Sequence, residues 1–215
     1  MKLYLAELLG TFALVFAGTG AIVINDISGG TIGHIGIAAT FGLVVMAMIQ
    51  TFGDVSGAQF NPAVSLAFAV AGKLTWARLP GYVVAQCVGA LLASGLLRFL
   101  FPTHELLGST LPSGAVSQSF VLEAVLTAML MLTILSVSTG AKEKGITAGI
   151  AIGAVVGLEA MFAGPICGAS MNPARSLAPA LVSGHLEHLW LYLLAPVVGA
   201  LIAVPLFRAV RGPGC

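Results

Sequence analysis

The chain has 215 residues, of which 58% are hydrophobic and only 8% are charged. A soluble domain usually carries about 25% charged residues, so lipid must be the solvent for most of this protein's surface. The net charge of +1 gives no indication of a nucleic-acid partner or of an acidic one.

Six apolar segments are long enough to cross a bilayer as helices, which takes about 20 residues. In chain order they are residues 3–24, 34–53, 79–101, 117–139, 145–163 and 189–210. The apolar segments 62–71 and 173–182 are too short to span and fit re-entrant segments better. The first span could be mistaken for a secretion signal, but it lacks a clear n-region and carries Glu7, so we expect it to remain as a span.

The basic residues predict the orientation of the chain. With the N-terminus in the cytoplasm, the inner side holds Lys2, Lys73, Arg78, Lys142, Lys144, Arg208 and Arg211. The outer side then holds Arg98 and Arg175 alone. This asymmetry predicts a multi-pass protein of the cell membrane, plasma or inner, with both termini in the cytoplasm.

The chain repeats itself at an offset of about 110 residues. Residues 57–65 (GAQFNPAVS) match 168–176 (GASMNPARS), residues 82–90 match 192–200, and Glu7 matches Glu123. Each half holds three spans and one short segment in the same order. Because three is an odd number, the halves enter the membrane from opposite sides. We therefore expect a single transmembrane domain over residues 1–215, an inverted repeat of approximately 1–101 and 117–215 joined by an outer loop.

An Asn-Pro-Ala motif opens both short segments. The two copies are Asn61-Pro62-Ala63 and Asn172-Pro173-Ala174. Asparagine is a favoured N-cap and proline a favoured first helical residue, so each motif predicts a helix start. In an inverted repeat these half-helices meet with their N-termini near mid-membrane, where irregular backbone must be buried or line a watery cavity. Loop carbonyls, asparagine donors and positive helix ends there favour neutral molecules and oppose cations and protons, which predicts a narrow pore.

The sequence resembles the aquaporin, or major intrinsic protein, family along nearly its whole length. The matching residues are Ala6-Glu7, Gly10-Thr11, Ser56-Gly57-Ala58, Asn61-Pro62-Ala63, Ala85-Gln86, Gly89-Ala90 and the run from Asn172 to Ser176. The resemblance implies an all-α membrane fold of six transmembrane helices and two re-entrant half-helices, and homotetramers with one pore per subunit. It also implies that Glu7 and Glu123 support the two re-entrant loops, with a proton relay as the alternative.

A selectivity filter is also implied by the resemblance. Arg175 follows the second motif directly, and a charge inside the membrane is costly and usually functional. A surface arginine that snorkels to the membrane interface is the alternative, which we expect for Arg98. The implied filter residues are Phe41, Ala160, Ala169 and Arg175. Strict water channels usually have histidine where Ala160 stands, so this filter should be wider and more apolar, whereas Ser176 resembles water channels because glycerol facilitators usually have aspartate there.

We therefore expect a passive channel that conducts water, with glycerol or other small neutral solutes, and excludes protons and ions. A glycerol facilitator is the alternative. A secondary transporter would need acidic ligands at mid-membrane, which the neighbourhoods of Asn61 and Asn172 lack. An enzyme is not expected, because no HExxH, GxSxG or paired-aspartate motif is present. The widely spaced cysteines form no metal-binding pattern, and no cofactor is expected.

The fifth predicted span and the residues just after it have open assignments. Glu159 is expected to line the outer vestibule, to meet a neighbouring subunit, or to bind loop backbone at the interface. Cys167 is expected in the outer vestibule. Gly149, Gly153 and Gly157 are spaced four apart, which predicts close approach to another helix.

Overall fold

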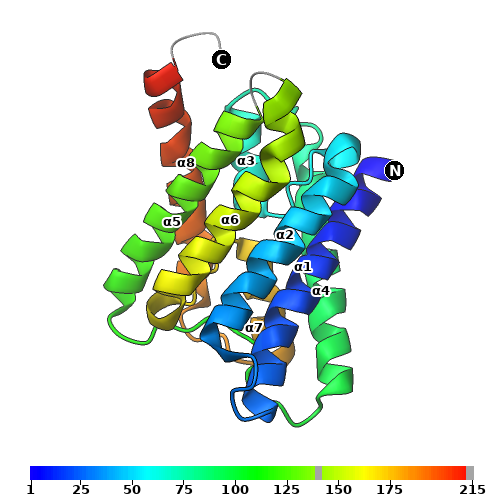
Figure 1. The fold of residues 1–215 in the computed structure, drawn as a ribbon, viewed down its shortest axis with the longest axis vertical. Coiled ribbons are helices and arrows are strands. Elements are labelled where there is room, and N and C mark those ends of the chain that lie inside the picture. The colour runs from blue at the N-terminus through cyan, green and yellow to red at the C-terminus, as the bar shows by residue number, and fades with distance from the viewer. Residues whose placement is uncertain (139–141, 212–215) are drawn as a thin grey trace.

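The computed structural model describes residues 1–138 and 142–211, with backbone alone for 142–146. These residues form eight helices and no strand (Figure 1). In chain order the helices are α1 (Lys2–Ile27), α2 (Gly33–Ser56), α3 (Pro62–Val70), α4 (Leu79–Leu100), α5 (Val116–Val137), α6 (Lys142–Cys167), α7 (Pro173–Ser183) and α8 (Leu189–Arg211). Six of them, all but α3 and α7, are long and apolar enough to cross a membrane, which confirms the predicted fold class.

The predicted spans agree with the helices to within a few residues. The largest error is at the end of α6, which was expected at Ala163 and continues to Cys167 with Pro165 inside it. A proline is tolerated inside a membrane helix where neighbouring helices satisfy the backbone group that it frees. The predicted end of the fourth span, Thr139, lies outside the described residues.

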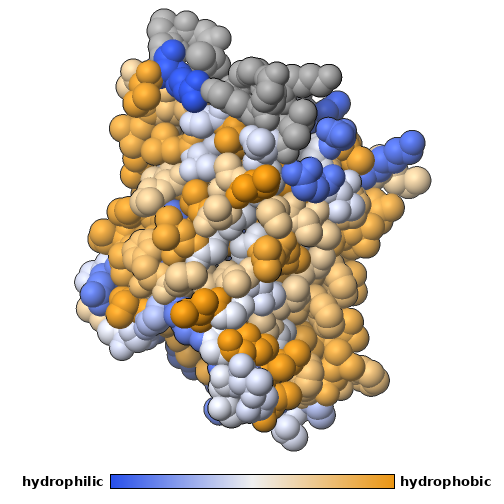
Figure 2. All heavy atoms as spheres, in the orientation of Figure 1, coloured by the Kyte–Doolittle hydropathy of each residue, from blue (hydrophilic) through white to orange (hydrophobic). Residues whose placement is uncertain are grey.

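The surface is apolar, unlike that of a soluble protein, and several polar side chains are buried beside the apolar core. Apolar side chains cover most of the face shown in Figure 2, and strongly hydrophilic residues lie mostly toward its ends. Leu43 and Leu158 are more than half exposed, whereas Glu7, Gln86 and Glu123 are completely buried. Lipid around the spans accounts for the exposed leucines, and buried polar groups in a membrane protein are placed inside with partners.

Glycines bring the two halves into close contact where α2 crosses α6. A Cβ added to Gly42 would lie 2.6 Å from the carbonyl oxygen of Gly153, and a Cβ on Gly153 would lie 2.6 Å from that of Gly42. No side chain fits at that distance, so the prediction that Gly153 permits close helix approach is confirmed.

The half-helices approach each other from opposite ends of the molecule. In Figure 1, α3 lies toward the end that holds the start of α1 and the end of α8, and α7 lies toward the other end. Each half-helix packs on a long helix of the other half, α3 on α8 and α7 on α4, and they touch each other. The loops that lead into α3 and α7 therefore meet inside the bundle.

Candidate pore and selectivity filter

Each half-helix is preceded by a loop with a left-handed backbone. The φ angles are 83°, 48° and 50° at Gly57, Ala58 and Phe60, and 85°, 42° and 54° at Gly168, Ala169 and Met171. For a residue with a side chain this conformation costs about 1 kcal/mol or more, so it persists where surrounding contacts hold it. The two buried glutamates supply those contacts.

Glu7 fixes the first loop through its backbone N–H groups. Its Oε1 accepts hydrogen bonds from the N–H of Gln59 at 3.0 Å and the hydroxyl of Ser56 at 2.6 Å. Its Oε2 accepts from the N–H of Phe60 at 2.7 Å and the Nε2 of Gln86 at 2.8 Å. Because a trans peptide points its C=O opposite to the following N–H, the carbonyls of the preceding residues face away from Glu7 and toward the cavity.

Glu123 holds the second loop in the same manner. Its Oε1 accepts from the N–H of Ser170 and its Oε2 from the N–H of Met171, both at 2.8 Å. The carbonyls of Ala169 and Ser170 are thereby turned toward the cavity that both residues line. The geometry places each glutamate against the loop that the sequence paired it with.

Asn61 and Asn172 join each half-helix to the opposite loop. The Oδ1 of Asn61 accepts from an N–H in the first turn of α3 at 2.9 Å, and its Nδ2 donates to the carbonyl oxygen of Met171 at 2.7 Å. The Oδ1 of Asn172 caps α7 at 3.0 Å, and its Nδ2 donates to the carbonyl oxygen of Phe60 at 2.8 Å. Each side-chain amide has two N–H donors, so one remains for the pore. Pro62 and Pro173 occupy the first helical positions, as predicted.

Two cavities enter the protein and meet at one ring of residues. The first, of about 660 Å³, extends from Asp54 to the asparagine pair, and the second, of about 440 Å³, opens beside His34. Among the described residues, the four that line both cavities are Phe41, Ala160, Ala169 and Arg175. These are the residues named from the sequence as a filter, and the structure places them together at the junction.

Arg175 is held from two sides at this junction. Its Nη1 donates to the carbonyl oxygen of Gly108 at 2.8 Å, and its Cζ lies 5.1 Å from the centroid of the Phe41 ring. Arg175 is 2% exposed, so its charge is kept within the protein rather than in lipid. The Phe41 ring in turn packs on Gly18, where an added Cβ would lie 2.2 Å from it.

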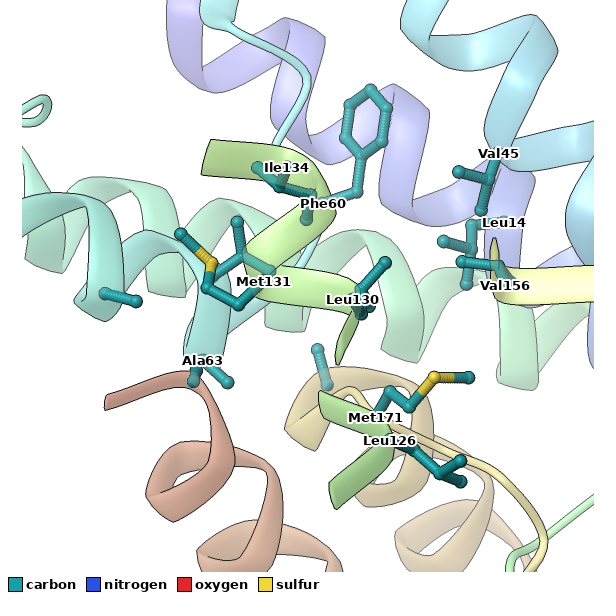
Figure 3. Close-up of a cluster of buried hydrophobic side chains, with 14 of the residues drawn as sticks. Leu14, Val45, Phe60, Ala63, Leu126, Leu130, Met131, Ile134, Val156 and Met171 are labelled. Carbon is teal, nitrogen blue, oxygen red and sulfur yellow. The ribbon is translucent and has the colours of Figure 1, made fainter. Parts of the chain in front are cut away.

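The first cavity has a largely apolar wall along its length. Leu14, Val45 and Val156 come from α1, α2 and α6 and lie close together in Figure 3. Leu130 of α5 and Met171 also line this cavity and are drawn there. A wall of this kind offers no hydrogen bonds, so a polar molecule finds its partners along the carbonyl side.

Two expectations about α6 are wrong. Cys167 is completely buried and lines neither cavity, because it faces the bundle interior, with its Sγ 3.5 Å from the carbonyl of Ala163. Glu159 is also completely buried, so it reaches neither the vestibule nor a neighbouring subunit. Its carboxylate oxygens have no hydrogen-bond partner within the part of the chain that the structure describes, so it binds no loop backbone there.

Arg98 lies in the last turn of α4 and is partly exposed, which agrees with the expected surface position. Its Nη1 donates to the carbonyl oxygens of Pro102 and His104, at 3.1 and 2.7 Å, in the loop between α4 and α5. That loop also supplies Gly108 to Arg175 and Thr110 to the outer cavity, neither of which the sequence singled out. Residues 110–112 (TLP) are flanked by polar residues, and this segment shows no hydrophobic periodicity that would predict a helix or a strand.

The described residues contain no cluster of His, Cys, Asp and Glu able to hold a metal.

Apolar spans, half-helices that meet inside the bundle, and a constriction between two cavities define the class of the protein as a polytopic helical membrane channel. The model of the major intrinsic protein family matches residues 1–207. The chain therefore belongs to the major intrinsic protein family, and it is a passive channel of the aquaporin type rather than an enzyme. This confirms the resemblance seen in the motifs.

Known relatives and a solved structure agree with this membership. The chain is 48% identical to Aquaporin NIP1-1 of Zea mays over 208 residues, which cover 96% of this chain and 74% of that protein. It is 46% identical to Nodulin-26 of Glycine max over 207 residues, covering 96% and 76%. The X-ray structure of the aquaglyceroporin from Plasmodium falciparum superposes with a TM-score of 0.85 at 26% identity, covering 97% of this chain and 96% of that one.

Proposed function

We propose that this channel conducts water together with small neutral solutes of the size of glycerol, and that it excludes ions and protons. The observation that carries the proposal is the ring of Phe41, Ala160, Ala169 and Arg175, which lines both cavities and so divides the two ends of one path. Any molecule that crosses the protein by this path passes these four side chains.

The chemistry of the ring matches a polyol. Arg175 presents guanidinium donors, the turned carbonyl of Ala169 presents an acceptor, and Phe41 presents an apolar ring. A molecule with hydroxyls along one edge and C–H groups along the other satisfies all three at once. Ala160 adds room without a polar group, which favours a solute larger than water. The Zea mays relative is named an aquaporin and the structural neighbour an aquaglyceroporin, which supports both cargoes.

The centre of the path supports the exclusion of cations. Asn61 and Asn172 cap the N-termini of α3 and α7 there, and each helix end carries roughly half a positive charge. Two such ends aimed at one point oppose a cation, and they orient each passing water with its oxygen toward the asparagines. The Arg175 charge acts in the same sense at the filter. Glu7 and Glu123, whose oxygens bind loop N–H groups, act as loop supports in this proposal rather than as a proton relay.

We also propose the wider architecture. Residues 1–215 form one channel domain, an inverted repeat of approximately 1–101 and 117–215, in a homotetramer with one pore per subunit. The protein lies in the cell membrane with both termini in the cytoplasm. The basic residues near the ends of α1 and α8, together with the shared end of the molecule at which these helices start and finish, support this orientation.

Stopped-flow light scattering on proteoliposomes tests the function. We expect faster osmotic shrinkage than in empty vesicles, and re-swelling as glycerol enters. The Ala160→His variant should lower glycerol permeability about tenfold, a barrier increase of about 1.4 kcal/mol, and lower water permeability much less. The Ala160→Ser variant, which keeps the width, is the matched control and should retain both fluxes. Unchanged glycerol entry in Ala160→His would remove Ala160 from the filter, and shrinkage no faster than in empty vesicles would end the channel proposal.

A glycerol facilitator with little water flux is the second candidate, favoured by the alanine at position 160 and by the aquaglyceroporin neighbour. The same vesicles separate the two candidates. Slow shrinkage in an impermeant osmolyte with fast glycerol entry supports the facilitator, and fast responses to both support the mixed channel.

A further inference from the structure

The His104 ring, in the loop between α4 and α5, is bound at both nitrogens. Its Nδ1 lies 3.0 Å from the backbone N–H of Leu107, and its Nε2 lies 3.3 Å from Oδ2 of Asp26 at the end of α1. Because a backbone N–H only donates, Nδ1 accepts and carries no proton. The proton of the neutral ring is then on Nε2 and faces the Asp26 carboxylate. The side chain is 9% exposed, so the ring is largely enclosed.

The residue that His104 holds has a costly backbone conformation. Leu107 has a φ of 52° and is completely buried against Val23 and Leu97. A leucine keeps such a conformation where its surroundings determine it. The hydrogen bond from its N–H to His104 is one of those determinants, and the burial of its side chain is the other.

The next residue connects this loop to the filter. Gly108, with a φ of 74°, packs on Thr19, where an added Cβ would lie 2.8 Å from that side chain. Its carbonyl oxygen accepts the 2.8 Å hydrogen bond from Nη1 of Arg175. Two consecutive left-handed residues, Leu107 and Gly108, thus separate the His104 ring from the guanidinium at the constriction.

We infer that His104 is a positioning residue for the filter: by binding the Leu107 N–H, it holds the Gly108 carbonyl where that oxygen fixes the Arg175 guanidinium. The inference rests on the proposed function, in which Arg175 limits the passage of neutral solutes. His104 touches no permeating molecule and acts through the loop.

Protonation of Nδ1 removes the acceptor that binds the Leu107 N–H. An imidazolium has donors on both nitrogens and no acceptor, so it faces the Leu107 N–H with a second N–H. The positive ring is attracted more strongly to Asp26, which keeps it at α1 while the loop loses its acceptor. The hold is therefore present when the ring is neutral and is lost when the ring is protonated.

The other charged groups around this loop do not replace the lost acceptor. Arg98 on α4 donates to the backbone carbonyl of His104, a bond that is independent of ring protonation. Glu105 faces His185, from the segment between α7 and α8, at 3.8 Å. Without the Gly108 carbonyl, the guanidinium of Arg175 finds acceptors on the pore side, where it narrows the path. Glycerol, which needs the full width, is obstructed more than water.

The test uses the full chain in liposomes equilibrated on both sides at pH 7.5 or pH 5.5, with water and glycerol permeability measured by stopped flow. For the unmodified protein we expect glycerol permeability to fall about fivefold at pH 5.5, the effect of about 1 kcal/mol, with a smaller change for water. His104→Asn keeps a side-chain acceptor that does not titrate, so its glycerol permeability should stay high at both pH values. His104→Leu has no acceptor and should have low glycerol permeability at both.

His188→Asn is the matched control. His188 is an exposed histidine with a φ of 60°, a conformation that asparagine tolerates, in the connection between α7 and α8. This variant should keep the pH response of the unmodified protein. A wild-type glycerol permeability that is equal at both pH values, or a His104→Asn variant that keeps the full pH response, overturns the inference. If His104→Leu does not fold, these two comparisons still decide. The absence of flux above empty vesicles at either pH overturns the proposed function itself.

Discussion

The two re-entrant loops have the same shape and are held by different partners. Glu7 accepts hydrogen bonds from two loop N–H groups and from the side chains of Ser56 and Gln86. Glu123 accepts from two loop N–H groups, those of Ser170 and Met171. The first loop is therefore fixed from within its own half of the chain.

Sequence differences at equivalent positions explain the contrast. Gln86 in the first half corresponds to Pro196 in the second, which has no side-chain donor. Ser56 corresponds to Cys167, whose thiol is a weak donor. Glu123 has lost a strong side-chain donor at both positions.

The second loop is instead secured by the segment between α4 and α5. Thr110 donates to the hydroxyl of Ser176 at 2.8 Å, and that hydroxyl also bonds to Ser170 in the loop. Arg175 is held by Gly108 of the same segment. The proposed filter therefore depends on a connecting loop as well as on the helices.

The largest expected effect is a difference in stability between variants of the two buried glutamates. Glu7→Leu leaves four buried donors without an acceptor and should lower the free energy of unfolding by on the order of 4 kcal/mol or more, and Glu123→Leu by roughly half as much. Thermal unfolding of the purified proteins in detergent measures the difference. Equal losses would show that the side-chain donors around Glu7 contribute little.

A second pair of variants should show no contrast. A Cβ added to Gly89 would lie 2.2 Å from the carbonyl oxygen of Leu8, and one on Gly199 would lie 2.0 Å from that of Ala124. Alanine at either position forces two long helices apart, so each variant should cost about 3 kcal/mol. If Gly89→Ala and Gly199→Ala differ strongly in melting temperature, the halves are less alike in packing than the structure shows.

The two buried serines after the motifs should separate stability from selectivity. Ser176→Ala removes the link between Thr110 and Ser170, both of which line cavities, so we expect a cost of about 1 kcal/mol and a change of about threefold in the ratio of glycerol to water permeability. Ser65→Ala removes an acceptor for Gln86, away from the cavities, and should cost a similar amount with the ratio unchanged. A changed ratio in Ser65→Ala would contradict the assignment of filter support to the outer loop.

The smallest expected effect is an increase in stability. Cys167→Ser places in the second half the hydroxyl that Ser56 supplies in the first, where it can donate to Glu123. We expect stabilisation of about 0.5–1 kcal/mol, seen as a higher melting temperature, and unaltered permeabilities because Cys167 lines neither cavity. The reverse change, Ser56→Cys, should destabilise by a similar amount, and a neutral result for both would show that this hydroxyl is dispensable.

Local rules made most of the fold predictable. Bilayer thickness sets the length of the spans, and Asn61-Pro62 and Asn172-Pro173 start helices by capping chemistry that acts within three residues. The family resemblance supplied the filter positions, and the structure brings all four together. Their roles in selectivity, like those of the glutamates, await the flux measurements above.

The errors concern two residues of α6, Glu159 and Cys167. Glu159 was placed by its nearness to the outer end of a span, and Cys167 by its position five residues before Asn172, but the rotation of α6 turns both inward. Helix rotation follows from packing of the whole bundle, which a single sequence does not specify.

The side-chain amides of Asn61 and Asn172 each donate a hydrogen bond to the opposite loop, and these two bonds bear on how the protein assembles. Each asparagine donates to a loop carbonyl oxygen in the other half of the chain, so neither half alone satisfies the hydrogen bonds of its central loop. We therefore expect a chain divided between the halves to give two fragments that do not conduct alone, and we expect conduction to return when both are produced together in one cell.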